Sequence, residues 1–189
     1  MLTTKLKYGI LLSSVISTSV FATEQHNISL GYAVAPQVVL NDFHRKEIKN
    51  ETKLNKLNGI NLQYRYETES PWGAVVSSTY LKGKEKNAKI SSTVQGNVAT
   101  KQFSLLAGPS YRFNKYISTY ALAGVANPKV SYNYYDSSHN TSGKTDISKK
   151  AFAYGVGVAI NPISNMSVHV GYEGNKYIKG FNVGVGYRF

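Results

Sequence analysis

The chain has 189 residues, 42% of them hydrophobic, and it is rich in Tyr (15) and Gly (16), which favours one domain built from strands rather than long helices. It contains no cysteine, so a disulfide framework and a thiolate metal site are excluded. Its formal net charge of +12 indicates acidic partners.

The N-terminus has the pattern of a secretory signal peptide. Lys5 and Lys7 precede an apolar run over residues 8–21, and Val20-Phe21-Ala22 permits cleavage after Ala22. We therefore expect a signal peptide at 1–22 and a mature domain at 23–189; loss of Lys5 and Lys7 lowers the charge by two, to +10. The run is too short and too rich in Ser and Thr to span a membrane as a helix, so membrane residence would require a closed sheet.

Segments of alternating apolar and polar residues follow in order along the mature chain, as expected for strands. In the last of them, Phe181, Val183 and Val185 share one parity with Tyr187 and Phe189, and the opposite parity is small or polar. The segment 116–126 is apolar on both parities, so its facing stays open, and Pro109 requires a bulge or a local break. The eight predicted strands cover about 27–35, 59–67, 72–81, 102–113, 116–126, 151–160, 166–173 and 179–189.

The links between these segments alternate in length. Long polar links at about 37–56, 82–97 and 127–149 alternate with short turns, and only the last external link, 175–178, is short. Short periplasmic turns and longer extracellular loops are typical of outer-membrane barrels, and an even strand count leaves both termini in the periplasm. We predict an all-β, eight-stranded antiparallel transmembrane up-and-down β-barrel in the outer membrane of a Gram-negative cell.

Aromatic and charged residues agree with this fold. The aromatic residues near the predicted periplasmic ends form one girdle: Tyr64, Tyr66, Trp72, Tyr111, Phe113, Tyr116, Tyr187 and Phe189. Five charged residues within the strand spans lie on the parity opposite the apolar residues, which would place them in the lumen and away from lipid: Arg65, Glu67, Arg112, Glu173 and Arg188.

An eight-stranded barrel has an interior that side chains fill, so polar inward residues predict a structural network rather than a channel or proton path. His169 and Glu173 share a strand face, but no further ligands accompany them, and a metal site needs three or four. His44 and His139 match no catalytic motif, so we predict no enzyme activity, catalytic residue, metal or cofactor. The predicted lumen network comprises Asn61, Gln63, Arg65, Glu67, Arg112, His169, Glu173 and Arg188.

Four stretches together resemble the Ail/Lom/OmpX family of small outer-membrane barrels: 59–67 (GINLQYRYE), 107–112 (AGPSYR), 152–157 (FAYGVG) followed by Asn161-Pro162, and 184–189 (GVGYRF). The resemblance covers the mature chain and is strongest in the strands. It implies an eight-stranded barrel whose C-terminal aromatic is read by the outer-membrane assembly machinery. For some members it also implies attachment to host cells or matrix and resistance to serum complement.

The first two long links are net positive, and two readings of their cations stay open. They would neutralise lipopolysaccharide phosphates in a structural envelope protein without a host ligand, or hold sulfated glycans or acidic patches on host proteins. We expect attachment and serum resistance through these loops, with matrix or complement-regulatory proteins as further possible partners, and no nucleic acid. The candidate binding residues are Arg45, Lys46, Lys49, Lys53, Lys82, Lys84, Lys86 and Lys89.

A second binding mode rests on strand propensity beyond the membrane band. Residues 89–94 (KISSTV) and 130–135 (VSYNYY) favour strand, so the third to sixth strands are candidates for a protruding sheet. The edge of such a sheet can accept a partner strand. We expect the barrel itself to be a monomer.

Overall fold

The computed structural model describes residues 25–38, 56–89, 94–136 and 141–189. The predicted signal peptide and most of the first long link, with Arg45, Lys46, Lys49 and Lys53, lie outside these residues. Within them, no helix is long and apolar enough to cross a membrane. The strands are β1 (Gln25–Val38), β2 (Leu57–Glu67), β3 (Trp72–Lys89), β4 (Val94–Arg112), β5 (Ile117–Asp136), β6 (Thr141–Ser148), β7 (Ala151–Ile163), β8 (Met166–Asn175) and β9 (Ile178–Arg188).

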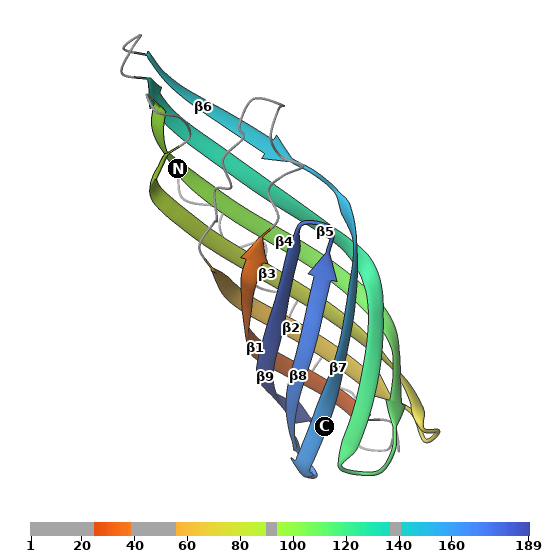
Figure 1. Ribbon diagram of the computed structural model, residues 1–189. Coiled ribbons are helices and arrows are strands. Elements are labelled where there is room, and N and C mark those ends of the chain that lie inside the picture. The colour runs from red at the N-terminus through yellow and green to blue at the C-terminus, as the bar shows by residue number, and fades with distance from the viewer. Residues whose placement is uncertain (1–24, 39–55, 90–93, 137–140) are drawn as a thin grey trace, which may run out of the picture.

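The strands form one antiparallel sheet that closes on itself (Figure 1). Its order is β4-β3-β2-β1-β9-β8-β7-β5, and β5 returns to pair with β4. Both β6 and β7 pair with β5, β6 over residues 129–136 and β7 over 117–126, so together they occupy one place in the wall. The barrel therefore has eight strands, which confirms the predicted fold class.

The structure resolves the facing of β5. Ser118, Tyr120 and Leu122 are buried in the lumen, whereas Ile117 and Val125 are exposed on the outer surface. The sequence pattern left this strand ambiguous because the interior beside it is itself apolar. Tyr120 and Leu122 pack there with residues of three other strands and of β5 itself, in a cluster made of Val75, Leu106, Tyr120, Leu122, Ala126 and Ala153.

Pro109 interrupts the ladder on one side only. Ala74 pairs with Pro109 in a continuous β3–β4 register, without a bulge. On the β5 side the pairing stops after Ala107 and resumes at Ser110 in the same register. A local break thus accommodates the proline, because its nitrogen has no hydrogen to donate.

Two of the expected long links are mostly strand rather than loop. β3 and β4 extend together to the pair formed by Lys89 and Gln95, and β5 and β6 to the pair formed by Asp136 and Thr141. The outer parts of β3, β4, β5 and β6 thus form a four-stranded sheet that continues beyond the ends of β8 and β9 (Figure 1). The link between β8 and β9 is short, as expected.

The barrel has two distinct ends. One end carries the short connections at 68–71, 113–116 and 164–165, and we call it the turn end. The long β3–β4 and β5–β6 hairpins extend from the opposite end, which we call the hairpin end. Gln25 and Phe189 both lie at the turn end, where the N–H groups of His26 and Phe189 donate to each other's carbonyl oxygens at 2.9 Å. The strand directions therefore place the start of β1 and the end of β9 together.

Candidate functional site

An apolar outer surface, bounded by aromatic residues, positions the barrel in a membrane. At the turn end, Trp72, Tyr111 and Phe113 form edge-to-face pairs with ring centroids 5.1 Å apart, and Tyr187 stacks on Phe189. These residues belong to the girdle predicted from the sequence. Such belts of amphipathic rings occur where a bilayer meets water.

The structure adds a second aromatic belt nearer the hairpin end. Tyr172 contacts both Tyr154 and Phe181 on the outer surface, and Tyr80 faces Phe103 across β3 and β4. Trp72 and Tyr80 are eight positions apart on β3, about 27 Å along a strand and about 20 Å after a tilt of roughly 40°. That separation is close to the apolar height of outer-membrane barrels, about 25 Å.

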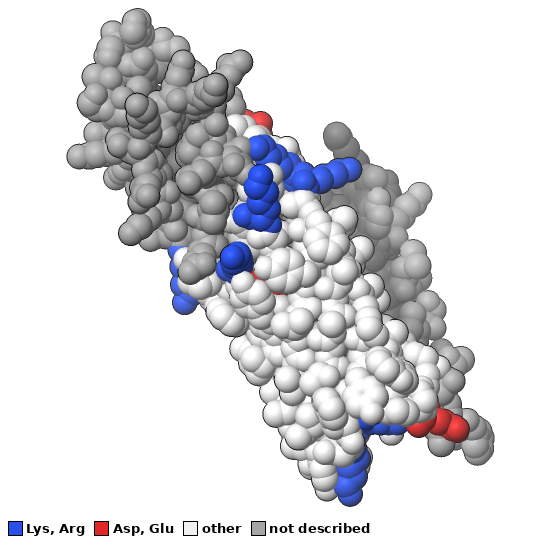
Figure 2. Space-filling model, turned by 45° about the vertical axis from the view of Figure 1, so that its right-hand side comes forward, with Lys and Arg blue, Asp and Glu red and all other residues white. Residues whose placement is uncertain are grey.

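Lysines lie directly beyond this second belt on the outer surface. Lys82 is the ladder partner of Lys101, and Lys101 is the ladder partner of Lys129, so three cations follow one another across β3, β4 and β5. Lys84 is two positions further along β3, on the same face. In Figure 2, Lys and Arg side chains gather at the two ends of a white band whose middle carries none on the visible face. We call Lys82, Lys84, Lys101 and Lys129 the lysine row.

The lysine row has excess positive charge. Lys129 lies 3.2 Å from the Asp146 carboxylate on β6, but the other three lysines make no ion pair within the described part of the chain. Three of them line a shallow hollow of about 240 Å3, together with Asn58 and Thr100. Like charges on facing strands repel each other, so an anion bound between them would be stabilising.

The candidate binding residues are only partly placed by the structure. Lys82 and Lys84 lie in the lysine row, whereas for Lys86 and Lys89 only the backbone, in β3, is described. Lys101 and Lys129 are not among the binding residues predicted from the sequence. The available signal was parity, because Lys101 alternates in phase with the outward Phe103 and Leu105. An outward cation just past an aromatic residue marks the edge of the lipid-facing band.

The hydrogen bonds and ion pairs of the polar interior group its described residues into two clusters. Near the turn end, the Glu67 carboxylate contacts three guanidinium groups: Arg188 at 2.8 Å, Arg65 at 3.5 Å and Arg112 at 3.6 Å. The Ser118 hydroxyl also donates to Glu67, at 3.0 Å. One carboxylate thus joins residues from β2, β4, β5 and β9.

The second cluster is centred on Glu173, further toward the hairpin end. Its carboxylate accepts hydrogen bonds from Thr79 at 2.8 Å and Ser77 at 2.9 Å, and longer ones from Ser104, Asn61 and Asn182. The His169 ring nitrogen Nε2 lies 3.1 Å from the Asn61 side-chain oxygen. Neutral donors therefore hold Glu173 in place, and Gln63 is also buried in the lumen.

These clusters have the features of structural filling. No three His, Asp or Glu side chains converge on a possible metal position among the described residues. Apolar layers also interrupt the polar interior: the one around Tyr120 and, nearer the hairpin end, a second one. The second layer consists of Ala33, Ala35, Leu57, Leu81, Val98, Val130, Tyr177 and Ile178.

Comparison with known proteins shows similarity along nearly the whole chain. The family model described as enterobacterial Ail/Lom protein matches residues 11–189. The chain is 37% identical to the virulence membrane protein PagC of Salmonella typhimurium, over 95% of each protein. It is 34% identical to the attachment invasion locus protein of Yersinia enterocolitica, over 93% of this chain and 92% of that protein.

Solved structures are similar in fold as well. The crystal structure of Ail, the attachment invasion locus protein of Yersinia pestis, in complex with the heparin analogue sucrose octasulfate, superposes with a TM-score of 0.66. It is 29% identical in sequence, and the match covers 88% of this chain and 99% of that one. The shared architecture is thus an outer-membrane barrel of nearly the same extent.

Proposed function

Because the chain belongs to the enterobacterial Ail/Lom family of non-enzymatic outer-membrane barrels, we propose that it mediates attachment to host cells or matrix and resistance to serum complement through the basic surface at its hairpin end. The names of its relatives associate the family with virulence, attachment and invasion. Attachment requires a binding surface outside the membrane, and the lysine row provides one.

The observation that carries the proposal is the hollow between Lys82, Lys84 and Lys101. Three cations without a described carboxylate partner line a single depression on an exposed face. Sulfate esters carry fixed negative charge and several acceptor oxygens, so a sulfated glycan is the ligand class that suits this surface. The Yersinia pestis Ail structure was solved with a heparin analogue, which supports the same ligand class in a family member.

The proposal assigns the hairpin end to the extracellular side and the turn end to the periplasm. Short periplasmic turns and longer external connections are the rule in outer-membrane barrels, and here the connections at 68–71, 113–116 and 164–165 are short. Under this orientation, the lysine row lies at the outer leaflet boundary and the sheet of β3 to β6 extends into the medium.

A structural role in the envelope is the rival function. The lysine row lies immediately beyond the second aromatic belt, where lipopolysaccharide phosphates would also contact it. The two roles use the same cations but differ in partner. Loss of the lysines would reduce host-cell attachment under our proposal, whereas it would change only envelope robustness under the structural role.

A second way to bind a partner is favoured by the free edges of the protruding sheet. Within the described residues, β6 pairs only with β5, and β3 has no β2 partner beyond Lys82. An exposed strand edge offers N–H and C=O groups to an added strand. Deletion of residues 84–94 would remove this edge of β3. Unchanged attachment by a barrel that still folds would exclude that edge as the binding site.

The proposal is tested by expression in a non-adherent, serum-sensitive bacterium. Wild type is compared with a Lys82→Gln/Lys84→Gln/Lys101→Gln variant and with Lys115→Gln, a control at the turn end. We expect attachment to epithelial cells and survival in serum with wild type and the control, and a clear loss of attachment with the triple variant. The proposal is wrong if wild-type cells behave like cells with an empty vector, or if the triple variant attaches normally.

A further inference from the structure

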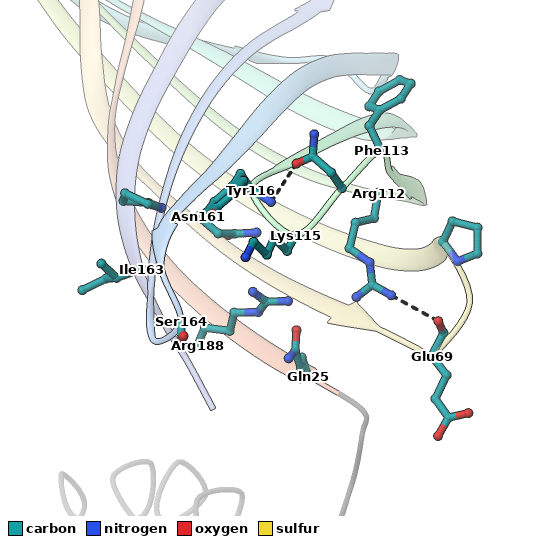
Figure 3. A pocket seen from close by; sticks show the side chains of 13 residues that line it. Gln25, Glu69, Arg112, Phe113, Lys115, Tyr116, Asn161, Ile163, Ser164 and Arg188 are labelled. Atoms are coloured by element: carbon teal, nitrogen blue, oxygen red, sulfur yellow. Dashed lines mark hydrogen bonds between the residues drawn. The ribbon is translucent and has the colours of Figure 1, made fainter.

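The turn end of the barrel opens into a hollow of about 630 Å3 that none of the roles above uses. It is lined by side chains from four strands: Gln25 of β1, Arg112 of β4, Asn161 of β7 and Arg188 of β9 (Figure 3). Lys115, in the connection after β4, also lines it. The hollow lies at the opposite end of the barrel from the lysine row, so an inference about it does not depend on the proposed function.

Cations outnumber carboxylates around this hollow. Arg112, Lys115 and Arg188 line it, whereas Glu69 is the acidic lining residue, and its carboxylate points away in Figure 3. Behind the lining, one carboxylate, Glu67, is the counter-charge for three guanidinium groups, those of Arg188 at 2.8 Å, Arg65 at 3.5 Å and Arg112 at 3.6 Å. The mouth of the barrel therefore keeps a positive excess in a partly dehydrated place, where electrostatic attraction to an anion is stronger than in bulk water.

Two hydrogen-bond donors in the lining are buried and have no hydrogen-bond partner among the residues that the structure describes. They are the Nε of Arg188, a residue 8% exposed, and the Nδ2 of Asn161, a residue 2% exposed. Buried donors without acceptors are rare in folded proteins and cost free energy. An acceptor oxygen placed against either of these donors would satisfy it.

The orientation of Asn161 is fixed by its other contacts. Its side-chain oxygen accepts a hydrogen bond from Arg65 Nη2 at 2.9 Å, and its backbone N–H donates to the Tyr116 carbonyl at 2.7 Å. Since the oxygen is engaged, the amide nitrogen is the atom left without a partner. Asn161 is thus held as a donor and cannot act as an acceptor toward the hollow without losing the bond to Arg65.

The remaining cations differ in how firmly they are held. Arg112 Nη2 donates to the carbonyl oxygens of residues 68, 69 and 70 at 3.0 to 3.2 Å, which fixes its position at the rim. Lys115 Nζ lies 4.9 Å from the centre of the Tyr116 ring and makes no ion pair within the described residues. Its long side chain can reach a ligand at the open side of the hollow.

We propose that the turn-end hollow binds a phosphate oxyanion, with Arg188 and Asn161 as buried donors and Lys115 as the cation at the open side. Guanidinium and amide N–H groups match the several acceptor oxygens of phosphate, and the surrounding positive excess supplies its counter-charge. The phosphate is either free inorganic phosphate or part of a phospholipid headgroup.

The test measures binding of inorganic phosphate to the folded protein in a phosphate-free detergent by isothermal titration calorimetry. Wild type is compared with Asn161→Asp, which keeps the acceptor for Arg65 but replaces the donor with a negative charge, and with Lys115→Gln. Lys150→Gln, which changes an exposed lysine directly before β7 that lines neither hollow, is the matched control. We expect saturable binding by wild type and the control, with a loss of about tenfold or more in Asn161→Asp and a smaller loss in Lys115→Gln.

Two further arms identify the source of the phosphate. Competition by a short-chain phosphatidylglycerol below its micelle concentration would assign the site to a lipid headgroup, and binding of inorganic phosphate without such competition would assign it to free phosphate. The proposal is overturned if wild type shows no saturable binding, if Asn161→Asp binds as well as wild type, or if acetate displaces phosphate at equal concentration.

Discussion

Arg188 and Glu67 lie 121 positions apart in the sequence, yet the Arg188 guanidinium donates to the Glu67 carboxylate at 2.8 Å inside the barrel. This contact joins β9 to β2, which are not neighbours in the sheet but both flank β1. Since Arg65 and Arg112 also contact Glu67, its carboxylate is the shared counter-charge for three guanidinium groups.

Replacing Glu67 with Gln should therefore destabilise the barrel strongly. The substitution leaves buried guanidinium groups without their counter-charge, a change that typically costs about 3–5 kcal/mol. The free energy of unfolding in urea, measured in detergent micelles, checks this value. Glu69→Gln, in the exposed turn, is the matched control and should stay within about 0.5 kcal/mol of wild type.

A second prediction concerns the close packing of Gly157 against Tyr120. A Cβ atom added at Gly157 would collide with the end of the Tyr120 ring. Gly157→Ala should thus cost about 1–3 kcal/mol, as expected for overpacking of a filled interior. Adding Tyr120→Leu should recover part of this loss, because the shorter side chain vacates that space. The packing explanation is wrong if Gly157→Ala costs as much stability in the presence of Tyr120→Leu as it does alone, that is, if the two costs simply add.

The outer surface should tolerate charge according to depth. Leu30 is 60% exposed on the apolar band and pairs with Leu62 and Val185 in the neighbouring strands. Leu30→Arg should cost about 2–4 kcal/mol, whereas Tyr187→Arg, in the turn-end girdle, should cost about 0–1 kcal/mol. Refolding into lipid vesicles followed by urea titration measures both values. A larger cost at Tyr187 than at Leu30 would contradict the proposed position of the bilayer.

The barrel interior should not conduct ions. Two apolar layers, around Tyr120 and around Leu57, interrupt the polar lumen in the described part of the chain. We expect purified protein in planar bilayers to leave the conductance at the level of lipid alone. Stepwise openings would instead show that the polar clusters line a continuous pathway.

The closed sheet could be predicted from the sequence because the lipid outside and the narrow lumen inside each restrict which side chains a strand can present, and this produces the period-2 pattern. Lipid tolerates only apolar side chains, and a narrow lumen tolerates small or mutually satisfied polar ones. The inward facing of Arg65 and the outward facing of Phe103 follow from this constraint. At β5 the constraint is weaker, since Tyr120 and Leu122 form an apolar patch inside the lumen, and parity alone could not assign the strand.

The binding surface was only partly predictable for a different reason. Beyond the bilayer the outer face is in water, so strands there need not be apolar. The segments 82–97 and 127–149 therefore have the composition of polar links, although 89–94 and 130–135 within them favour strand. Lys101 and Lys129 were missed because their proximity to Lys82 depends on the register between strands. The register is a tertiary property, fixed by closure of the barrel, that the spacing of residues in one strand does not contain.

The most direct test of the account is binding of a sulfated oligosaccharide to the purified barrel in lipid nanodiscs, measured as a function of salt. We predict that wild type and Lys115→Gln bind with an affinity that falls as salt rises, and that the Lys82→Gln/Lys84→Gln/Lys101→Gln variant, equally folded, binds at least tenfold more weakly. Binding by the triple variant equal to that of wild type would contradict the assignment of the lysine row as the ligand site.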